Sequence, residues 1–239
     1  MQTFETPVQR IEECGADIVT VRLEQPEGYE FRAGQWFRLT LLTAQGPDTR
    51  TLSHASSPHD GWIELTTRRS DSAFKQALFT LAEGDIVEVT AAGGRFTLPE
   101  GDTFAALIGG IGITPIHSML RTAVAEGRAF GDGLLVYGNR DTTCEPYLAE
   151  FEAMGRNGVR VVRVLEHPPE EWTGERGFIS ADIVSRHLGT DDGRPFVVSG
   201  PPVMVNAMAA VLDVMGIDQA RRHMEPFGSM RSGGNASAT

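Results

Sequence analysis

The segment 106–115, Ala-Leu-Ile-Gly-Gly-Ile-Gly-Ile-Thr-Pro, has the composition of a phosphate-binding turn. Its apolar run predicts a buried strand that ends in a glycine turn, and Thr114 and Pro115 predict the start of a helix. We expect Thr114 to cap this helix and Pro115 to occupy its first turn. Glycines at such a junction let the backbone approach a phosphate, which a helix N-terminus favours electrostatically. The segment therefore predicts a dinucleotide site, although Pro115 stands where the usual G-x-G-x-x-G fingerprint has its third glycine.

Three further segments place polar or charged groups beside predicted turns. Arg50 precedes Ser53 and Ser56, an arrangement in which a guanidinium can bind a phosphate and hydroxyls can bond a heterocycle. The turn 70–72, Ser-Asp-Ser, is either an anion-binding turn or an ordinary N-cap. Segment 197–204 again reads as strand, sharp turn and helix, at the strand end where open α/β sheets bind ligands. Taken alone, these segments are equally typical of a solvated arginine, a cap and a plain loop.

The part of the chain up to about Leu98 is patterned as short strands. Its apolar residues alternate with polar ones and are separated by Gly, Pro and Asp turns, which favours an antiparallel barrel or sandwich. The predicted strands are 19–23, 36–42, 62–67 and 86–90, with one helix over 74–81.

Beyond Pro99 the pattern changes to apolar strands that alternate with helices, which predicts a doubly wound parallel sheet. The strands are predicted at 104–108, 134–137, 159–165 and 196–199, and the helices at 116–126, 146–154, 180–187 and 203–215. We therefore expect a first domain over 1–99, a second over 100–228 and a flexible tail over 229–239.

Composition excludes several classes of function. The formal net charge of −11, with no basic block, argues against binding to nucleic acid or to anionic membranes. The N-terminus lacks the features of a signal peptide, and the longest apolar stretch is too short and too rich in glycine to span a bilayer. We expect a cytoplasmic protein.

The two cysteines, Cys14 and Cys144, lie far apart and outside any C-x-x-C pair, so reduced and inert thiols are expected. Two cysteines also exclude a thiolate-bound iron–sulfur cluster within this chain. The six histidines have no metal-binding spacing, and no protein metal site is expected. The single lysine, Lys75, among 21 basic residues is explained most simply by biased codon usage.

Read in order, five motifs resemble those of the ferredoxin–NADP reductase family, and the resemblance covers the chain to about residue 228. They are Gly34-Gln35, Arg50-x-Leu-Ser, Gly109-Gly-x-Gly-x-Thr-Pro, Ser199-Gly-Pro-Pro-x-Met and Glu225-Pro-Phe. The resemblance implies an N-terminal antiparallel Greek-key β-barrel that binds flavin and a C-terminal α/β domain that binds NAD(P), with the flavin ring in the cleft between them.

The same resemblance implies the site residues. Flavin contacts are implied for Arg50, Thr51, Leu52, Ser53, Asp71, Ser72 and Ala73. Contacts with the nicotinamide cofactor are implied for Gly110, Gly112, Thr114, Ser199, Gly200, Pro201 and Met204. Ser53 near flavin N5, Ser199 beside the nicotinamide and Glu225 near the hydride path are the implied catalytic residues, and Phe227 is implied to cover the ring.

The chain departs from the family at four places. Leu52 stands where the family usually has a tyrosine, with His54 or Trp36 as substitutes for ring stacking. Ser199 replaces a frequent cysteine. Ala91-Ala92 replaces the usual Gly-Pro, and the chain continues past Phe227.

The expected function is that of an FAD-dependent reductase that moves hydride between NAD(P)H and flavin N5 and serves an external acceptor. FAD is expected because Arg50 and the 70–72 turn suit a pyrophosphate. Arg140 favours the 2′-phosphate of NADPH, whereas Asp141 next to it favours NADH, so both remain open with NADPH preferred.

A ferredoxin, a flavodoxin, an oxygenase component or a small quinone is the expected acceptor. The arginines that could form a docking face, or be dispersed and solvated, are Arg68, Arg69, Arg95, Arg121, Arg221 and Arg222. The alternative function is that of a non-catalytic flavin- or nucleotide-binding subunit that senses redox state or regulates a partner.

Overall fold

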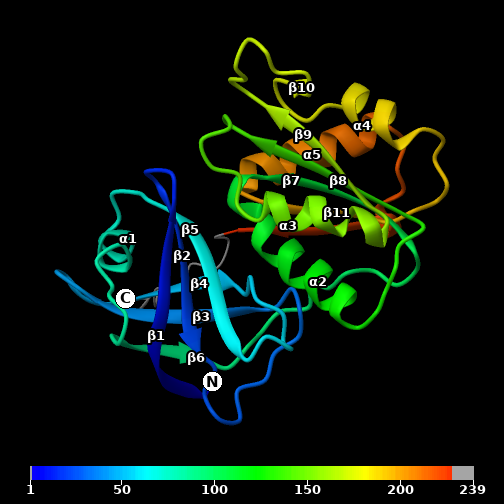
Figure 1. Ribbon diagram of the computed structural model, residues 1–239. Helices are drawn as coiled ribbons and strands as arrows, with labels where there is room; N and C mark the ends of the chain where they lie inside the picture. The colour runs from blue at the N-terminus through cyan, green and yellow to red at the C-terminus, as the bar shows by residue number, and fades with distance from the viewer. Residues whose placement is uncertain (1, 228–239) are drawn as a thin grey trace, which may run out of the picture.

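The computed structural model describes residues 2–227, which fold into two domains that each contain one six-stranded sheet (Figure 1). The predicted tail, 229–239, lies outside the described residues. The predicted boundary at residue 99 falls in the segment that joins the last strand of the first sheet to the first strand of the second.

The first sheet is antiparallel and has the order β4-β3-β6-β1-β2-β5. Its strands are β1 (Thr3–Cys14), β2 (Ile18–Glu24), β3 (Trp36–Thr43), β4 (Gly46–Ser53), β5 (Trp62–Arg68) and β6 (Ile86–Thr90). In β3 the alternation expected of a half-buried strand is clear, because Phe37, Leu39 and Leu41 are buried in the core. The sheet curls into a half-barrel with β4 and β5 at its two edges (Figure 1).

A short helix, α1 (Ala73–Leu78), packs against the half-barrel and is shorter than the predicted 74–81. Ser72 is its N-cap, and the hydroxyl oxygen of Ser72 accepts a hydrogen bond from the backbone N–H of Lys75. Phe74 and Leu78 are fully buried in the core of the first domain.

The second sheet is entirely parallel and has the order β10-β9-β8-β7-β11-β12. Its strands are β7 (Thr103–Gly109), β8 (Asp132–Asn139), β9 (Val159–Leu165), β10 (Glu175–Arg176), β11 (Phe196–Gly200) and β12 (Arg222–Pro226). The helices are α2 (Ile113–Ala125), α3 (Leu148–Ala153), α4 (Ala181–Leu188) and α5 (Pro202–Val214), with the 3₁₀ turns η1 (Gly110–Gly112), η2 (Met154–Asn157) and η3 (Gln219–Arg221). One apolar core lies between the sheet and α2 and α3, and a second lies on the side of α4 and α5. The predicted two-domain fold class is confirmed, with a doubly wound sheet in the second domain.

The prediction that Thr114 caps α2 is wrong. The glycine turn winds into η1 and continues directly into α2, which places Gly112 at the N-cap and Thr114 inside the first helical turn. The hydroxyl of Thr114 donates instead to the carbonyl of Ile111 at 3.2 Å. Because η1 runs directly into α2, the backbone N–H of Ile113 bonds main-chain carbonyls of this turn, and the helix begins without a side-chain cap.

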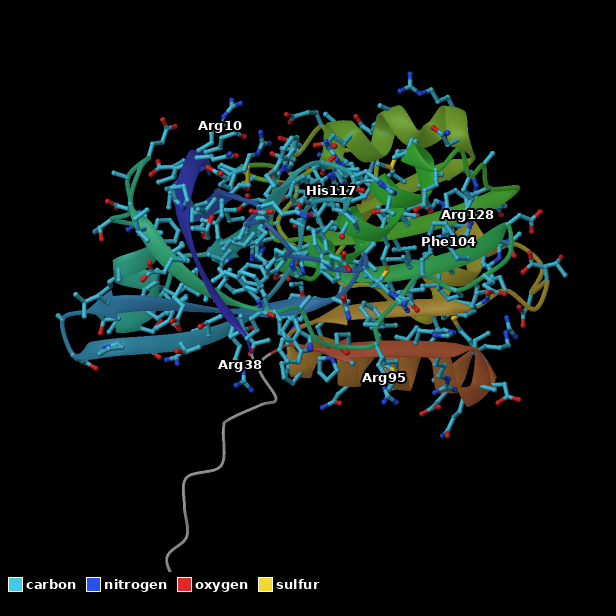
Figure 2. The ribbon with its side chains drawn as sticks, turned by 90° about the horizontal axis from the view of Figure 1, so that it is seen from below. Arg10, Arg38, Arg95, Phe104, His117 and Arg128 are labelled. Carbon is cyan, nitrogen blue, oxygen red and sulfur yellow. A yellow bond between two sulfur atoms is a disulfide. The ribbon has the colours of Figure 1, made fainter. Side chains whose placement is uncertain are left out.

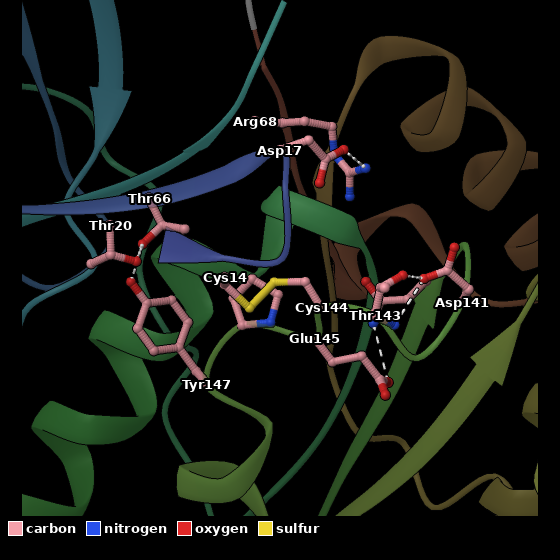
Figure 3. The surroundings of a disulfide bond; sticks show 12 residues. Cys14, Asp17, Thr20, Thr66, Arg68, Asp141, Thr143, Cys144, Glu145 and Tyr147 are labelled. Atoms are coloured by element: carbon pink, nitrogen blue, oxygen red, sulfur yellow. Dashed lines mark hydrogen bonds and ion pairs between the residues drawn. A yellow bond between two sulfur atoms is a disulfide. The ribbon is translucent and has the colours of Figure 1, made fainter. Parts of the chain in front are cut away.

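The prediction of reduced thiols is also wrong, because Cys14 and Cys144 form a disulfide (Figure 3). Cys14 ends β1 in the first domain, and Cys144 lies in the loop between β8 and α3 in the second. Their Cα atoms are 5.5 Å apart, within the range that a disulfide requires, although 130 positions separate them in sequence. The disulfide therefore joins the two domains covalently.

Among the described residues, none of the helices combines the length and apolar character that crossing a bilayer requires.

Candidate active site

A cleft of about 830 Å³ lies between the two domains. On the side of the first domain it is lined by β3, β4, β5 and α1, at the seam where the half-barrel is open. On the other side it is lined by the turn after β7, by the start of α5 and by β12. Carboxyl ends of parallel strands are where open α/β sheets bind ligands, so the second domain presents its expected ligand-binding edge to this space.

The predicted flavin residues of β4 all line this cleft: Arg50, Thr51, Leu52 and Ser53. The guanidinium of Arg50 contacts the carboxylate of Asp48 and lies 5.7 Å from the centroid of the Phe74 ring. Ser53 is opposite Trp36 in the β3–β4 register, so a hydroxyl and an indole meet at the end of this hairpin.

Of the two proposed substitutes for a stacking tyrosine, only Trp36 lines the cleft. His54 is fully buried behind it, and its ring stacks on Phe31 at 3.9 Å. The prediction that His54 contacts the flavin ring is therefore wrong, because the imidazole belongs to the core of the first domain. The Trp36 indole lies against Gly93 and Gly94, where a Cβ atom would approach it to 2.8 Å.

Asp71, Ser72 and Ala73 lie at the start of α1 and are not among the residues that line the cleft. The Ser72 hydroxyl acts as an ordinary helix cap there. Their predicted contact with a pyrophosphate stays a prediction.

Lys75 lines the cleft, and the sequence reasoning missed it. Its ammonium group contacts the hydroxyl oxygen of Thr67 on β5. Burial, and then repulsion by Arg50, lower the pKa of Lys75 to about 8. A signal existed in the sequence: a chain that uses arginine almost everywhere keeps one lysine, next to the buried face of a helix.

The glycines of the turn after β7 have different roles. Gly112 is packed so tightly that a Cβ atom would lie 2.2 Å from the carbonyl oxygen of Ser199. Gly110 has a φ of +50° and open space beside its Cα atom. Gly112 therefore lets β7 and β11 end side by side, and Gly110 leaves the turn accessible to a ligand. Thr114 and Ile111 complete this wall of the cleft.

Ser199 is fully buried, and its hydroxyl donates to the carbonyl of Gly112. It lies behind the cleft wall, to which Pro201 contributes directly. Met204 packs against Gly109 and Gly200. The predicted contact of Ser199 with the nicotinamide stays a prediction, and its observed bond holds two strand ends together.

Glu225 and Phe227 reach the cleft from β12 and the residue after it. In the parallel register Glu225 is the partner of Ser199, and the backbone N–H of Phe227 donates to the carbonyl of Gly200 at 2.8 Å. Burial raises the pKa of the Glu225 carboxyl. The structure thus brings Ser53 and Glu225, from different domains, to the same cleft.

Arg140 lies outside this cleft, in the loop after β8 that contains Cys144. It is exposed, and no carboxylate among residues 2–227 lies within ion-pair distance of it. Asp141 accepts hydrogen bonds from the hydroxyl and the backbone N–H of Thr143, and these bonds lower its pKa.

Helix α2 makes hydrogen bonds and an ion pair to the first domain, and one of its residues, His117, is labelled in Figure 2. His117 Nδ1 lies 2.7 Å from the carbonyl oxygen of Ala55, and the Ser118 hydroxyl donates to the carbonyl of Ser56 at 2.6 Å. Arg121 pairs with Asp60 at 2.9 Å. These contacts hold the two walls of the cleft in place.

The predicted docking face of arginines is not supported by the pairing of these side chains. Four of the six lie within ion-pair distance of carboxylates: Arg68 with Asp17, Arg121 with Asp60 and Glu150, Arg221 with Asp191, and Arg222 with Asp213. Their positive charge is balanced locally, so they offer little net attraction to an acidic partner.

Comparison with known proteins agrees with this geometry. Residues 107–210 match the family described as "Oxidoreductase NAD-binding domain". The chain is 29% identical to ferredoxin–NADP reductase B of Sorangium cellulosum over 241 residues, which cover 95% of this chain and 98% of that protein. It is 27% identical to the phenol hydroxylase P5 protein of Acinetobacter pittii over 246 residues, 98% of this chain and 68% of that protein.

The fold is similar to that of a ferredoxin NADP⁺ reductase from Neisseria gonorrhoeae, whose crystal structure contains bound FAD and NADP. The TM-score is 0.82 at 21% identity, with 95% of this chain and 99% of that one covered. Several other relatives are longer, and the chain spans 14% to 55% of the length of the nitrate reductases and cytochrome b5 reductases that it matches.

Proposed function

Because this chain belongs to the ferredoxin–NADP reductase family, we propose that it is an FAD-dependent oxidoreductase that transfers electrons between NAD(P)H and an external acceptor. One observation carries the proposal: hydroxyl, carboxyl, cationic and aromatic side chains from both domains line a single cleft. Its volume of about 830 Å³ lies in the range of small-molecule sites.

The residues of the first domain fit a flavin dinucleotide. Arg50 and Lys75 provide positive charge for a diphosphate, and Thr51 and Ser53 provide hydroxyls for a heterocycle. Trp36 and Leu52 provide apolar surface for the ring. When bound, FAD supplies an acceptor for two electrons that can be released one at a time.

The second domain, in this proposal, binds the nicotinamide cofactor along the turn after β7 and the loop after β11. The open backbone of Gly110 admits a phosphate, and Pro201 and Thr114 orient the other end toward the first domain. Glu225 holds a proton at higher pH than an exposed carboxyl does, since burial disfavours its charged form. Phe227 shields the cleft from water.

The test is an anaerobic titration of the FAD-loaded protein with NADPH and, separately, with NADH. We expect NADPH to bleach the visible flavin absorption, with NADH less effective because Arg140 is free to bind a 2′-phosphate. A protein that binds FAD but is bleached by neither cofactor would support the alternative, a redox-sensing or regulatory subunit. A protein that cannot be loaded with FAD would contradict the proposal altogether.

For the acceptor we propose a ferredoxin, a flavodoxin or an oxygenase component. The names of two relatives support this range, since one is a ferredoxin–NADP reductase and another a phenol hydroxylase protein. Reduction of candidate carriers by the NADPH-reduced protein, followed by their absorption spectra, ranks them directly.

The cytoplasmic location stays a prediction and conflicts with the disulfide, because structural disulfides persist mainly in oxidising compartments. Alkylation of thiols in intact cells before lysis distinguishes a reducing compartment from an oxidising one. Labelled Cys14 and Cys144 would place the protein in a reducing compartment, and protected cysteines would place it in an oxidising one.

A further inference from the structure

Lys75 is a cation without an anionic partner. Its ammonium group is half-buried on α1, and its hydrogen-bonding contact is the neutral hydroxyl of Thr67 on β5. No carboxylate among residues 2–227 lies within ion-pair distance of it. Keeping an ammonium group out of water costs free energy unless an opposite charge compensates it. The ammonium group therefore needs a negative charge beside it, and the described part of the chain does not provide one.

A cationic neighbour of Lys75 adds to this imbalance. Arg50, on β4, repels the ammonium group of Lys75, and both side chains line the same cleft. Asp48 balances Arg50 only, through an ion pair on the β4 side. Two cations from different elements that line one cleft are the arrangement expected for a ligand with two adjacent negative charges.

We propose that Lys75 is a binding and specificity residue for the FAD diphosphate, with its ammonium group on one phosphate and the Arg50 guanidinium on the other. This inference rests on the proposed function and deepens it. It predicts that the protein distinguishes FAD from flavins without a diphosphate mainly through these two side chains, and that Thr67 keeps the ammonium group at the cleft wall.

The proposal has a consequence for pH. The cleft contains two guanidinium groups (Arg38 and Arg50) and one carboxyl (Glu225), and Asp48 pairs with Arg50 at its edge. The pKa of Lys75 is about 8 in the free protein. A ligand that binds the protonated amine raises that pKa. FAD affinity should therefore be full below pH 8 and fall as the pH rises above it.

The first experiment uses the fact that Lys75 is the only lysine. Reductive methylation with ¹³C-formaldehyde labels this amine and the chain's α-amino group, which gives two methyl signals in an NMR titration. We expect FAD to raise the pKa of Lys75 by about one unit or more, which corresponds to at least about tenfold coupling between proton and ligand, and riboflavin to leave it unchanged. An equal pKa with and without FAD overturns the inference.

The second experiment compares flavin affinities of the Lys75→Met apoprotein by quenching of flavin fluorescence. A charged hydrogen bond is worth about tenfold to a hundredfold in affinity, so FAD should bind that much more weakly at pH 7, with riboflavin unaffected. The pH dependence above pH 8 should disappear. The matched control is Arg10→Met, which also removes one positive charge but on β1, outside the residues that line the cleft; Figure 2 labels Arg10.

Each outcome separates the inference from the function. Equal FAD affinity of the wild type and Lys75→Met, or an equal loss for FAD and riboflavin, overturns the assignment of Lys75 and leaves the reductase intact. A wild-type protein that binds neither flavin overturns the proposed function and the inference with it. If Lys75→Met does not fold, the methylation experiment on the wild-type chain still decides.

Discussion

Arg140 and Asp141 are neighbours with opposite charges, and their contacts differ. Asp141 is engaged with Thr143 in its own loop, whereas Arg140 is exposed and has no carboxylate partner in the described part of the chain. A carboxylate already bonded within its loop is poorly placed to accept the ribose hydroxyls of NADH. A free guanidinium is well suited to a 2′-phosphate.

Replacement of this guanidinium should therefore affect one nicotinamide cofactor only. We expect Arg140→Gln to raise the Kd for NADPH about tenfold to a hundredfold, because one charge-assisted contact is lost, and to leave NADH unchanged. Binding titrations with both cofactors measure the ratio, and Arg156→Gln, on the surface after α3, is the charge-matched control. Equal changes for NADPH and NADH would show that Arg140 does not read the 2′-position.

His54, which the sequence suggested as a flavin contact, instead makes stability depend on pH. Complete burial lowers the pKa of His54 to about 3, although its bond to the carbonyl of Gln35 opposes the shift. The unfolded chain, with a histidine pKa near 6.5, takes up the proton first. The contribution of His54 to stability is therefore present above pH 6.5 and is lost as the pH falls toward 3.

The free energy of unfolding should decrease as the pH falls below 6.5, with a slope that reaches about 1.4 kcal/mol per pH unit roughly one unit lower, as expected for one proton taken up on unfolding. Urea denaturation between pH 7 and pH 5 measures this slope. His54→Gln should remove the part of this slope that comes from one proton. His167→Gln, at an exposed position, should retain the wild-type slope. A slope that His54→Gln leaves unchanged would assign the proton uptake to other groups.

At the scale of elements, the loop between β8 and α3 is held at two points in the half that leads into α3. Cys144 joins it to β1, and Tyr147, with a φ of +62°, stacks on His117 at 3.7 Å. The hydroxyl of Tyr147 also donates to the carboxylate of Glu64 at 3.2 Å, and it contacts the hydroxyl of Thr66 (Figure 3). This loop includes Arg140, so the disulfide restrains a segment that we expect to bind the nicotinamide cofactor.

Removal of the disulfide should loosen this loop and destabilise the fold. We expect Cys14→Ser combined with Cys144→Ser to lower the free energy of unfolding by about 2–5 kcal/mol, since the unfolded chain loses a long cross-linked loop. Urea denaturation measures the loss, and hydrogen exchange should increase over 140–147. Dithiothreitol should reproduce the effect in the wild type and do nothing to the double variant; unchanged stability after reduction would contradict a structural role.

The sequence predicted most elements because their periodicity is strong, and it failed where local pattern competes with tertiary contacts. β6 and β9 begin and end at the predicted residues, whereas no strand range was predicted for β1, β4, β10 or β12. β1 contains a proline and a shift of register after Val8, and the polar β12 is an edge strand added to the sheet. The disulfide and Lys75 depend on segments that meet only in three dimensions.

At the scale of the whole molecule, the change of period near residue 99 was enough to predict two domains, but not how they contact each other. Two of the bonds from α2 to the first domain go to main-chain carbonyls, those of Ala55 and Ser56. Every residue type has such a carbonyl, so no sequence pattern marks these two contacts. The position of the cleft between the domains follows from these bonds and was available only by resemblance.

Arg121 is a charged contact of this interface, between Asp60 of the first domain and Glu150 of the second. We expect Arg121→Gln to lower the free energy of unfolding by about 1 kcal/mol, as for other partly exposed pairs, and to increase hydrogen exchange over 55–60. The matched control is Arg160→Gln, whose partner Asp132 belongs to the same domain. Equal exchange over 55–60 in both variants would show that Arg121 does not hold the domains together.

The disulfide also determines how the molecule would respond to mechanical force. A pull on the two ends of the oxidised chain is transmitted through the Cys14–Cys144 bond, which shields the 130-position segment between them from tension. That segment contains most of the half-barrel and the first two strands of the parallel sheet. At ~3.5 Å per residue, the stretched oxidised chain should be shorter than the reduced one by roughly 450 Å.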